Sequence, residues 1–177
     1  LMAGNAVLLK VAAATPAAAT LAAAGAGDAF ASGFGLLTLH RPSNVDDPAV
    51  LRRLLQELAD ISRQTPLVFP VHPRTRDRIS AAGLDELLAS ANILLLPPQG
   101  YLEMLGLMRE SRLVLTDSGG IQEETTALGV PCITLRESTE RPITVAEGTN
   151  TIVGTDPAAI RRAWQDIVTG GGKAGRQ

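Results

Sequence analysis

The residues with the clearest chemical meaning are two adjacent glycines at the predicted start of a helix. Gly119 and Gly120 lie between an apolar segment that ends at Leu115 and a helix that we expect over residues 121–128. Without a Cβ, glycine lets its backbone N–H come close to a ligand, and the N-terminal end of a helix attracts negative charge. The preceding Ser118 could cap this helix or bind a phosphate oxygen. The segment therefore predicts an anion-binding turn.

Two glutamates, Glu123 and Glu124, fall in the first turns of the same predicted helix. Either could be a surface acid that the helix dipole tolerates. A second role is open for Glu124, because acidic residues in dinucleotide-binding folds accept hydrogen bonds from a ribose diol. The residues alone leave both interpretations open, with the ribose contact offered for Glu124.

Polar side chains also follow the other predicted strands. They are His40 and Arg41 after the first strand, His72 after the second, Gln99 after the third, and Arg136 and Arg141 after the fifth. Because the carboxyl ends of parallel strands meet at one edge of a sheet, these side chains should share a site with Ser118. We therefore include Gln99 among the predicted substrate-binding residues.

The two histidines also have plainer interpretations. His40 could be satisfied by a backbone carbonyl, although the neighbouring Arg41 and Asn44 favour a ligand-facing role. His72 could simply end a strand, since Pro73 follows it directly.

The two arginines after the fifth strand have alternative partners as well. Arg136 and Arg141 could pair with Glu137 and Glu140, or their guanidinium groups could bind a diphosphate. The sequence alone does not separate these arrangements.

Several familiar catalytic motifs are absent from the sequence. There is no G-x-x-x-x-G-K-[ST] phosphate loop, and no G-x-S-x-G turn that would make Ser118 a nucleophile. No G-x-G-x-x-G follows a strand, which argues against NAD. Two histidines and one cysteine, far apart in the sequence, do not make a convincing metal site. We predict a site that uses no metal and no cofactor.

The composition is that of a globular protein without a strong charge. The 177 residues are 45% hydrophobic, and their net charge of -2 gives no general attraction to nucleic acid or to an anionic membrane. Cys132, the single cysteine, lies in an apolar run and is predicted to be a small buried hydrophobe. No apolar run reaches the ~20 residues that span a membrane. No basic segment precedes the Ala-rich start, so a signal peptide is not predicted and the cytoplasm is the default location.

Strands and helices alternate from residue 33 onward. We expect strands over residues 34–39, 67–71, 93–96, 113–115, 132–135 and 151–153. Helices should span residues 48–63, 76–82, 101–110, 121–128 and 157–168, with Asp47 capping the first and Trp164 packing on the sheet from the last. Apolar strands separated by helices indicate an α/β fold with a doubly wound, Rossmann-like parallel sheet.

The two ends of the chain differ from this pattern. Residues 1–32 are rich in Ala and Gly, with Pro16 in the middle, and are expected to be a weakly ordered remnant of an interdomain linker. Residues 33–169 should form the domain, and residues 170–177 a flexible, truncated tail. Because the chain starts at Leu1 and ends in a Gly-rich segment, we expect a piece of a longer protein.

Several strings of residues together resemble one enzyme family. They are LTLHRPSNV at residues 37–45, VHP at 71–73, TDSGGIQEE at 116–124, STERP at 138–142 and EGT at 147–149. In this order and spacing they resemble the non-hydrolysing UDP-N-acetylglucosamine 2-epimerases, and the similarity runs from about Gly4 nearly to the C-terminus. The resemblance implies a two-domain, glycosyltransferase-B type architecture of which this chain is the C-terminal half.

The resemblance also implies roles for individual residues. The family's UDP-binding positions match Ser118, Gly119, Gly120 and Glu124, with the glutamate on the ribose. The position matching His40 faces the diphosphate and leaving group, so His40 is assigned the catalytic role, and the position matching Arg141 also lies at the substrate in the family. In some bacterial members, the positions matching Arg41 and His72 contribute to an adjacent regulatory site for UDP-N-acetylglucosamine.

The implied reaction converts UDP-N-acetylglucosamine to UDP-N-acetylmannosamine through elimination and re-addition of UDP, without metal or nicotinamide. The acid and base of the family are carboxylates of the first domain, so the partners expected here are a UDP-sugar and a missing N-terminal domain. The parent enzyme would be a cytoplasmic homodimer in cell-surface polysaccharide biosynthesis, and this chain alone would be inactive.

Three positions depart from the family pattern. Ser43 and Ile143 stand where many members have glutamate, and Met104 stands where an aromatic often lies near the uracil. These differences concern sugar specificity and regulation. Two other functions stay open: the donor-binding half of a glycosyltransferase-B enzyme, and a non-catalytic module that senses nucleotide sugars.

Overall fold

The sheet is the centre of the fold in the computed structural model, which describes residues 17–27, 30 and 32–172. It has six strands in the order β3-β2-β1-β4-β5-β6, and every pairing is parallel. The strands are β1 (Gly35–Thr38), β2 (Leu67–Pro70), β3 (Ile93–Leu96), β4 (Leu113–Thr116), β5 (Cys132–Thr134) and β6 (Asn150–Ile152). The predicted doubly wound, Rossmann-like α/β fold is confirmed.

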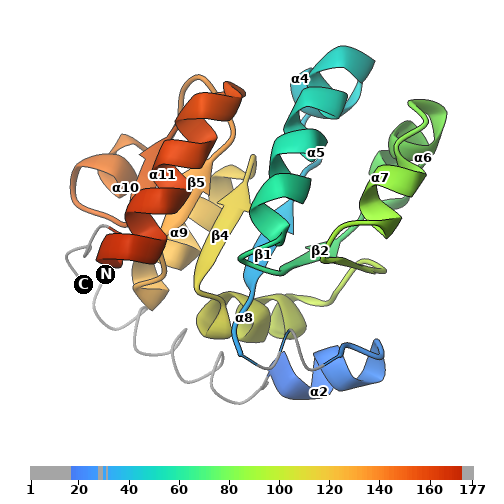
Figure 1. Cartoon of the computed structure of the whole chain (residues 1–177). Helices are drawn as coiled ribbons and strands as arrows, with labels where there is room; N and C mark the ends of the chain where they lie inside the picture. Colours follow the sequence, from blue (N-terminus) through green and yellow to red (C-terminus); the bar gives the residue numbers. More distant parts are fainter. Residues whose placement is uncertain (1–16, 28–29, 31, 173–177) are drawn as a thin grey trace.

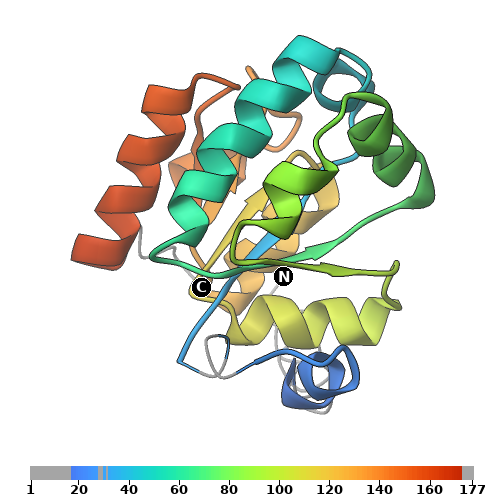
Figure 2. The same cartoon turned by 45° about the vertical axis from the view of Figure 1, so that its right-hand side comes forward.

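Helices cover both faces of this sheet (Figures 1 and 2). One face is covered by α5 (Pro48–Ser62), α6 (Pro73–Ala81), α7 (Asp85–Ala89) and α11 (Pro157–Gly170). The other face is covered by α2 (Ala17–Ala23), α8 (Tyr101–Glu110) and α9 (Gly119–Leu128). Both faces of each central strand are therefore buried, which explains why the strands are apolar without a polar alternation.

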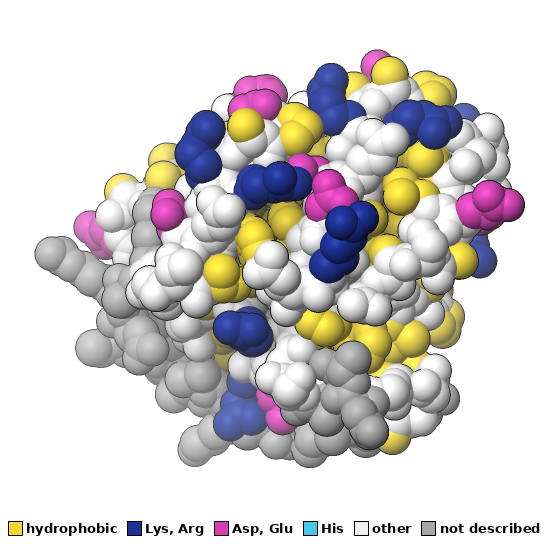
Figure 3. Space-filling view, in the orientation of Figure 1, with side chains coloured by type: hydrophobic (Ala, Val, Ile, Leu, Met, Phe, Trp, Pro, Cys, Tyr) yellow, Lys and Arg dark blue, Asp and Glu magenta, His cyan; other side chains and the backbone are white. Residues whose placement is uncertain are grey.

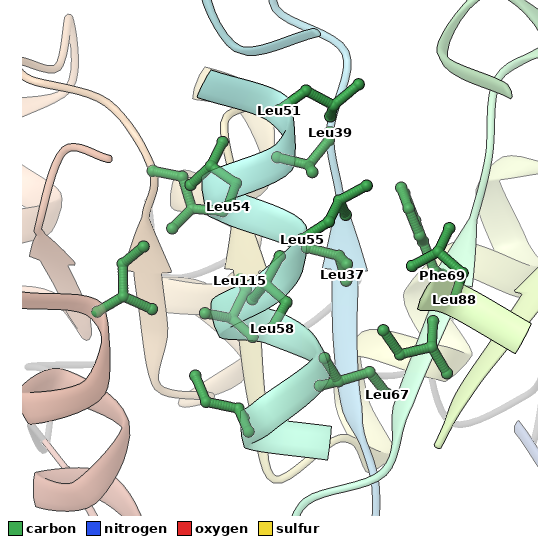
Figure 4. Packing of buried hydrophobic residues seen from close by; sticks show 14 of the residues in the cluster. Leu37, Leu39, Leu51, Leu54, Leu55, Leu58, Leu67, Phe69, Leu88 and Leu115 are labelled. Atoms are coloured by element: carbon green, nitrogen blue, oxygen red, sulfur yellow. The ribbon is translucent and has the colours of Figure 1, made fainter. Parts of the chain in front are cut away.

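Consecutive strand residues point into two separate hydrophobic cores. Leu37 and Leu115 pack in the same core as Leu58 of α5, and Figure 4 shows the leucines of α5 facing those of β1 and β4. Leu36 and Val114, one position away in each strand, belong to the core on the opposite face. A shift of either strand by one residue would exchange the two sets, so the packing determines the register.

The two longest helices among the described residues begin at aspartate caps. The Asp47 carboxylate accepts hydrogen bonds from the backbone N–H of Ala49 at 2.9 Å and of Val50 at 3.4 Å, as predicted. On α11, Trp164 is buried in the core, and its indole N–H donates to the Thr65 hydroxyl at 2.9 Å. The predicted packing of Trp164 from the last helix is confirmed.

A group of ion pairs links α5 and α11 at the surface. Arg161 donates to the two oxygens of the buried Glu57 carboxylate at 2.8 and 3.0 Å and lies 3.4 Å from Asp60. On the face in Figure 3, basic and acidic side chains are interspersed and do not form a large patch of one sign. This arrangement agrees with the weak net charge of the chain.

Three short helices were not predicted. They are α4 (Pro42–Val45), α7 and α10 (Pro142–Ala146), and each is too short to show a helical period in the sequence. The predicted helix over residues 76–82 was placed too late, because α6 already begins at Pro73, where the side chain of His72 accepts a hydrogen bond from the Arg74 N–H at 3.1 Å. Proline at the first helical position favours such starts.

The region predicted to be a linker contains an ordered helix. In α2, Ala17 and Leu21 are buried in the same core as Leu105 of α8. Residues 1–16 and 173–177 lie outside the described residues, so the linker and tail boundaries remain predictions. No helix within the described residues is long and apolar enough to cross a membrane.

Candidate functional site

The candidate site lies between the ends of β1 and β4, where the order of the strands in the sheet reverses. The chain leaves β1 toward β2 on one side, while β4 lies on the other side of β1. Ligands of open α/β sheets bind at such a switch point, outside the carboxyl ends of the strands. Thr38 of β1 is in register with Thr116 of β4, and their hydroxyls are 2.7 Å apart. The residues that follow these two threonines therefore meet.

Asp117, directly after β4, is the most buried charged group of this region, with no exposed surface. Its carboxylate accepts hydrogen bonds from the backbone N–H of His40 at 3.1 Å and of Arg41 at 3.0 Å. The amide of Asn44 donates to it at 3.1 Å, and Nδ1 of His40 lies 2.9 Å from Oδ1. The carboxylate thus holds the segment after β1 against the end of β4.

The surroundings of Asp117 have opposing effects on its pKa. Burial raises the pKa, but the hydrogen bonds from the His40 ring, the Arg41 backbone and the Asn44 amide, together with the His40 charge, outweigh it. The net result is a pKa below the ordinary aspartate value. Asp117 is therefore ionised at neutral pH.

The side chain of Asn44 makes its contacts inside the protein. Asn44 is buried, and its amide donates to the Leu135 carbonyl at 2.9 Å as well as to Asp117. His40 remains accessible, with 49% of its side chain exposed. Arg41 is half-buried, and its Nε donates to the Asp117 carbonyl at 3.3 Å.

The start of α9 forms the other wall of the site. The helix begins at Gly119, two residues earlier than predicted, with Ser118 at the N-cap position. The Ser118 side chain makes no capping hydrogen bond, and its backbone N–H donates to the Thr116 hydroxyl at 3.0 Å. A Cβ on Gly120 would meet no atom within 4 Å, so this part of the turn is open to a ligand.

Two arginines near this turn pair with glutamates. Arg136 donates to Glu140 at 2.6 and 3.2 Å, and Arg141 lies 2.9 Å from Glu123 of α9. The hydrogen bond from Arg136 is the main reason why the pKa of Glu140 falls to about 2. The sequence suggested Glu137 as a further partner, but the structure instead pairs Arg141 with Glu123. Glu140 also approaches the α9 turn, since a Cβ on Gly119 would lie 3.4 Å from its Oε2.

The chain between β5 and α10, residues 135–141, rests on a buried polar network. Gln122 of α9 accepts hydrogen bonds through Oε1 from the Thr139 hydroxyl at 2.5 Å and from the Asn150 amide at 2.9 Å. The same amide donates to the Thr144 hydroxyl at 3.1 Å. These contacts join the β5–α10 loop to α9 and β6, and so determine where Arg141 lies.

Glu124 is half-buried on α9 and accepts a hydrogen bond from the phenol of Tyr101. Burial raises the pKa of Glu124, the Tyr101 hydrogen bond partly lowers it, and the charge of Glu123 raises it further. Burial and the Glu124 carboxylate raise the pKa of Tyr101. The pair places an acid and an exposed aromatic ring together on one side of the turn.

The comparisons with known proteins agree with this geometry. The sequence profile described as UDP-N-acetylglucosamine 2-epimerase matches residues 3–176. The chain belongs to this epimerase family. It is 44% identical over 128 residues to the UDP-N-acetylglucosamine 2-epimerase of Methanococcus maripaludis, which covers 71% of the chain and 35% of that protein. The identity is also 44%, over 129 residues, to the UDP-2,3-diacetamido-2,3-dideoxy-D-glucuronate 2-epimerase of Pseudomonas aeruginosa, with 72% of the chain and 35% of that protein covered.

A solved epimerase structure has the same fold. The Methanocaldococcus jannaschii UDP-GlcNAc 2-epimerase, in complex with UDP-GlcNAc and UDP, superposes with a TM-score of 0.74 at 36% identity. The superposition covers 90% of this chain and 46% of that one. The matched part of the chain spans about a third of the length of these two curated relatives.

The structure brings together most of the residues that the sequence assigned to the epimerase site. His40, Arg41 and the turn from Ser118 to Gly120 meet at the ends of β1 and β4. Glu124 and Arg141 lie on or against α9. The roles assigned to these residues remain predictions, because the geometry places them without showing what they bind.

Two assigned residues make only local contacts within the described part of the chain. The Gln99 amide donates to the Pro97 carbonyl of its own loop at 2.8 Å. His72 is exposed and caps α6. Neither has a hydrogen bond to the group around Asp117 among the described residues.

Sequence reasoning missed Asp117 and Tyr101 as site residues. Asp117 was treated as part of the TDSGG turn, although an aspartate between a buried strand and a helix start must find hydrogen-bond donors if it is buried. Tyr101 was assigned to a helix start, and no local signal pointed to Glu124 as its partner.

Cys132 behaves as predicted. It is fully buried, and burial raises the pKa of its thiol to about 11. Within residues 17–27, 30 and 32–172, no three His, Cys, Asp or Glu side chains gather in a way that could hold a metal ion.

The Asp117 carboxylate should make the stability of the fold depend on acid pH. Its pKa is lower in the folded chain than the ordinary 3.8 of the unfolded chain, so the free energy of unfolding should fall as the pH drops below 3.8 toward the folded value. Asp117→Asn should remove this contribution and cost about 3 kcal/mol at pH 7, because buried donors lose an ionised acceptor. Urea denaturation at a series of pH values measures both effects.

The exposed Asp77 of α6 provides a matched control, Asp77→Asn. This variant removes an exposed carboxylate and leaves the hydrogen bonds of Asp117 in place. If the profile of Asp117→Asn below pH 3.8 ran parallel to that of the wild type, the assigned pKa direction would be wrong.

Proposed function

We propose that this chain is the UDP-binding C-terminal domain of a UDP-N-acetylglucosamine 2-epimerase. The observation that carries the proposal is the turn from Ser118 to Gly120, which begins a ten-residue helix at the switch point of the sheet and has open space at Gly120. The family membership of the chain supports the same ligand, because the M. jannaschii relative was solved with UDP-GlcNAc and UDP.

The diphosphate would bind at this turn. Backbone N–H groups at the start of α9 and the positive end of the helix favour phosphate oxygens, and the Ser118 hydroxyl is not used as a cap. Arg141 and Arg136 are close enough to add positive charge, but they are paired with Glu123 and Glu140. The Arg141–Glu123 pair is exposed on both sides, and exposed pairs contribute little stability, so a phosphate can replace the Glu123 carboxylate at small cost.

The ribose would bind at Glu124. Its carboxylate, half-buried beside the Tyr101 ring, can accept hydrogen bonds from two adjacent hydroxyls. The phenol of Tyr101 already donates one such bond. A ribose diol would supply the same kind of donor, which is why this acid suits a nucleoside and not an isolated phosphate.

The complete reaction would need a second domain. Elimination of UDP requires a base at the C2 proton, and the described residues of this site offer the half-exposed His40 and the buried Asp117. We assign the acid and base carboxylates to an N-terminal domain and expect this chain to be inactive alone. The whole protein would act in the cytoplasm as a homodimer, in the synthesis of cell-surface polysaccharide.

The relatives of this chain agree on the nucleotide but not on the sugar. Relatives named for two different UDP-sugars are each 44% identical to the chain. UDP is common to both names. A binding test on this chain should therefore use UDP itself.

UDP should bind the isolated chain weakly, and Ser118→Trp should abolish binding, because an indole at the start of α9 would fill the diphosphate position. Isothermal calorimetry with UDP up to millimolar concentration measures this. Ser90→Trp is the matched control, since Ser90 is exposed and precedes β3 at the opposite edge of the sheet. A folded wild-type chain without detectable UDP binding would contradict the proposal.

Glu124→Ala should weaken UDP binding roughly 10- to 100-fold, the value of a hydrogen bond to a charged group. The same substitution should have little effect on 2′,3′-dideoxy-UDP, which has no diol. Glu123→Ala, one position earlier on α9, controls for the loss of negative charge and should leave the ratio of the two affinities unchanged. An equal loss for both ligands in Glu124→Ala would exclude the ribose contact.

The isolated chain should not exchange the C2 proton of UDP-N-acetylglucosamine with solvent. Incubation in D₂O followed by NMR of the sugar reports this exchange directly. Deuterium at C2, above the level in a Ser118→Trp sample, would show that the chain contains its own base and would overturn the assignment of catalysis to a second domain.

A further inference from the structure

We propose that Asp117 is a positioning residue that sets the tautomer of His40, so that Nδ1 carries the ring proton and Nε2 is the nitrogen that meets the ligand. The part about the ligand depends on the proposed function. The part about the tautomer depends only on the contacts of the chain.

The contact between the two side chains determines where the proton lies. Nδ1 of His40 is 2.9 Å from Oδ1 of Asp117, which has no exposed surface. An ionised carboxylate has only acceptor sites, and a neutral imidazole has one donor and one acceptor nitrogen. Nδ1 must therefore be the donor, which leaves the lone pair of the neutral ring on Nε2.

The carboxylate cannot turn away from the ring, because other donors hold it. The His40 N–H lies 3.1 Å from both oxygens, and the Arg41 N–H and the Asn44 amide donate to Oδ2 at 3.0 and 3.1 Å. Oδ1 is thus the oxygen that faces the imidazole. The lowered pKa of Asp117 agrees with a carboxylate that stays ionised beside the ring.

His72, the other histidine of the chain, has the opposite arrangement. Its Nδ1 accepts a hydrogen bond from the Arg74 N–H at 3.1 Å, so its neutral ring carries the proton on Nε2. The two histidines therefore provide an internal comparison, in which the hydrogen bond to Nδ1 runs in opposite directions.

The assigned tautomer suits a group that binds a phosphate. The lone pair on Nε2 can take a proton from solvent, which gives an imidazolium with one N–H on Asp117 and the other on Nε2. The Nε2–H can then donate to an oxygen of a bound diphosphate, with 49% of the ring exposed to receive it.

Long-range ¹H–¹⁵N spectra of the labelled chain at pH 8.5 test the tautomers. The chain has two histidines, so two imidazole patterns are expected. His40 should show the Nδ1–H pattern and His72 the Nε2–H pattern, assigned with His72→Gln. A predominant Nε2–H pattern for His40 in the wild type would overturn the proposal without the need for any variant.

Asp117→Asn should invert the tautomer of His40. The Arg41 N–H and the Asn44 amide both donate at the Oδ2 position, so the new amide would place its oxygen there and its NH₂ toward Nδ1. Nδ1 would then have to accept, as happens when the aspartate of a catalytic triad is replaced by asparagine. A folded Asp117→Asn chain that keeps the Nδ1–H pattern would show that the carboxylate is not the cause.

Asn44→Ala is the matched control, because the Asn44 amide donates to the other oxygen of the same carboxylate, Oδ2, while the His40 ring lies against Oδ1. This variant should lose stability and keep the Nδ1–H pattern of His40. A change of tautomer in Asn44→Ala would mean that general disturbance of the loop, and not the contact with Asp117, decides the result.

Titration with UDP separates this inference from the proposed function. UDP should shift the Nε2 resonance of His40. UDP binding with no change at His40 would overturn the ligand role of Nε2. If UDP does not bind at all, the proposed function fails, while the tautomer pattern of the free chain still decides the role of Asp117.

Discussion

A buried negative charge holds the end of β1 against the end of β4. Removing an ion from water costs several kcal/mol unless close partners replace the water. Asp117 finds those partners in one short segment, which supplies two backbone N–H groups, the Asn44 amide and the His40 ring. The charge and the conformation of the segment therefore depend on each other. Because Asp117 also precedes α9, the same contact places His40 and Arg41 beside the start of that helix.

A second buried polar group places the opposite side of the site. Gln122 lies one turn into α9 and joins the β5–α10 loop through Thr139 and β6 through Asn150. Both sides of the site are thus held by contacts with α9. Asp117, at the start of the helix, holds the segment after β1, and Gln122, within the helix, holds the β5–α10 loop. The position of α9 is itself fixed, because Ile121 and Leu128 pack against the hydrophobic core.

Much of the fold could be predicted because it depends on apolar pattern. The strands, α5 and α8 are long or apolar enough to show their period, and β3 and α8 have the bounds expected from the sequence. The short helices that start at Pro42 and Pro142 could not be found in this way.

For the site, polar residues after strands correctly indicated one edge of the sheet. The role of Asp117 could not be predicted, because a sequence shows side chains and not the backbone N–H groups that supply part of its hydrogen bonds. The contacts of Asn44 could not be predicted for a related reason, since its partners are brought together only by the folded chain.

The approach of Glu140 to Gly119 has a consequence for how tightly an anion could be held. The carboxylate lies near the start of α9 while it is bound to Arg136, so the turn already experiences a negative charge from its own chain. An incoming phosphate would replace the Glu140 carboxylate near this turn. It would not meet positive charge that no other group already balances. Its net binding energy is then a difference between two similar interactions. A site built in this way favours reversible occupancy by an anion.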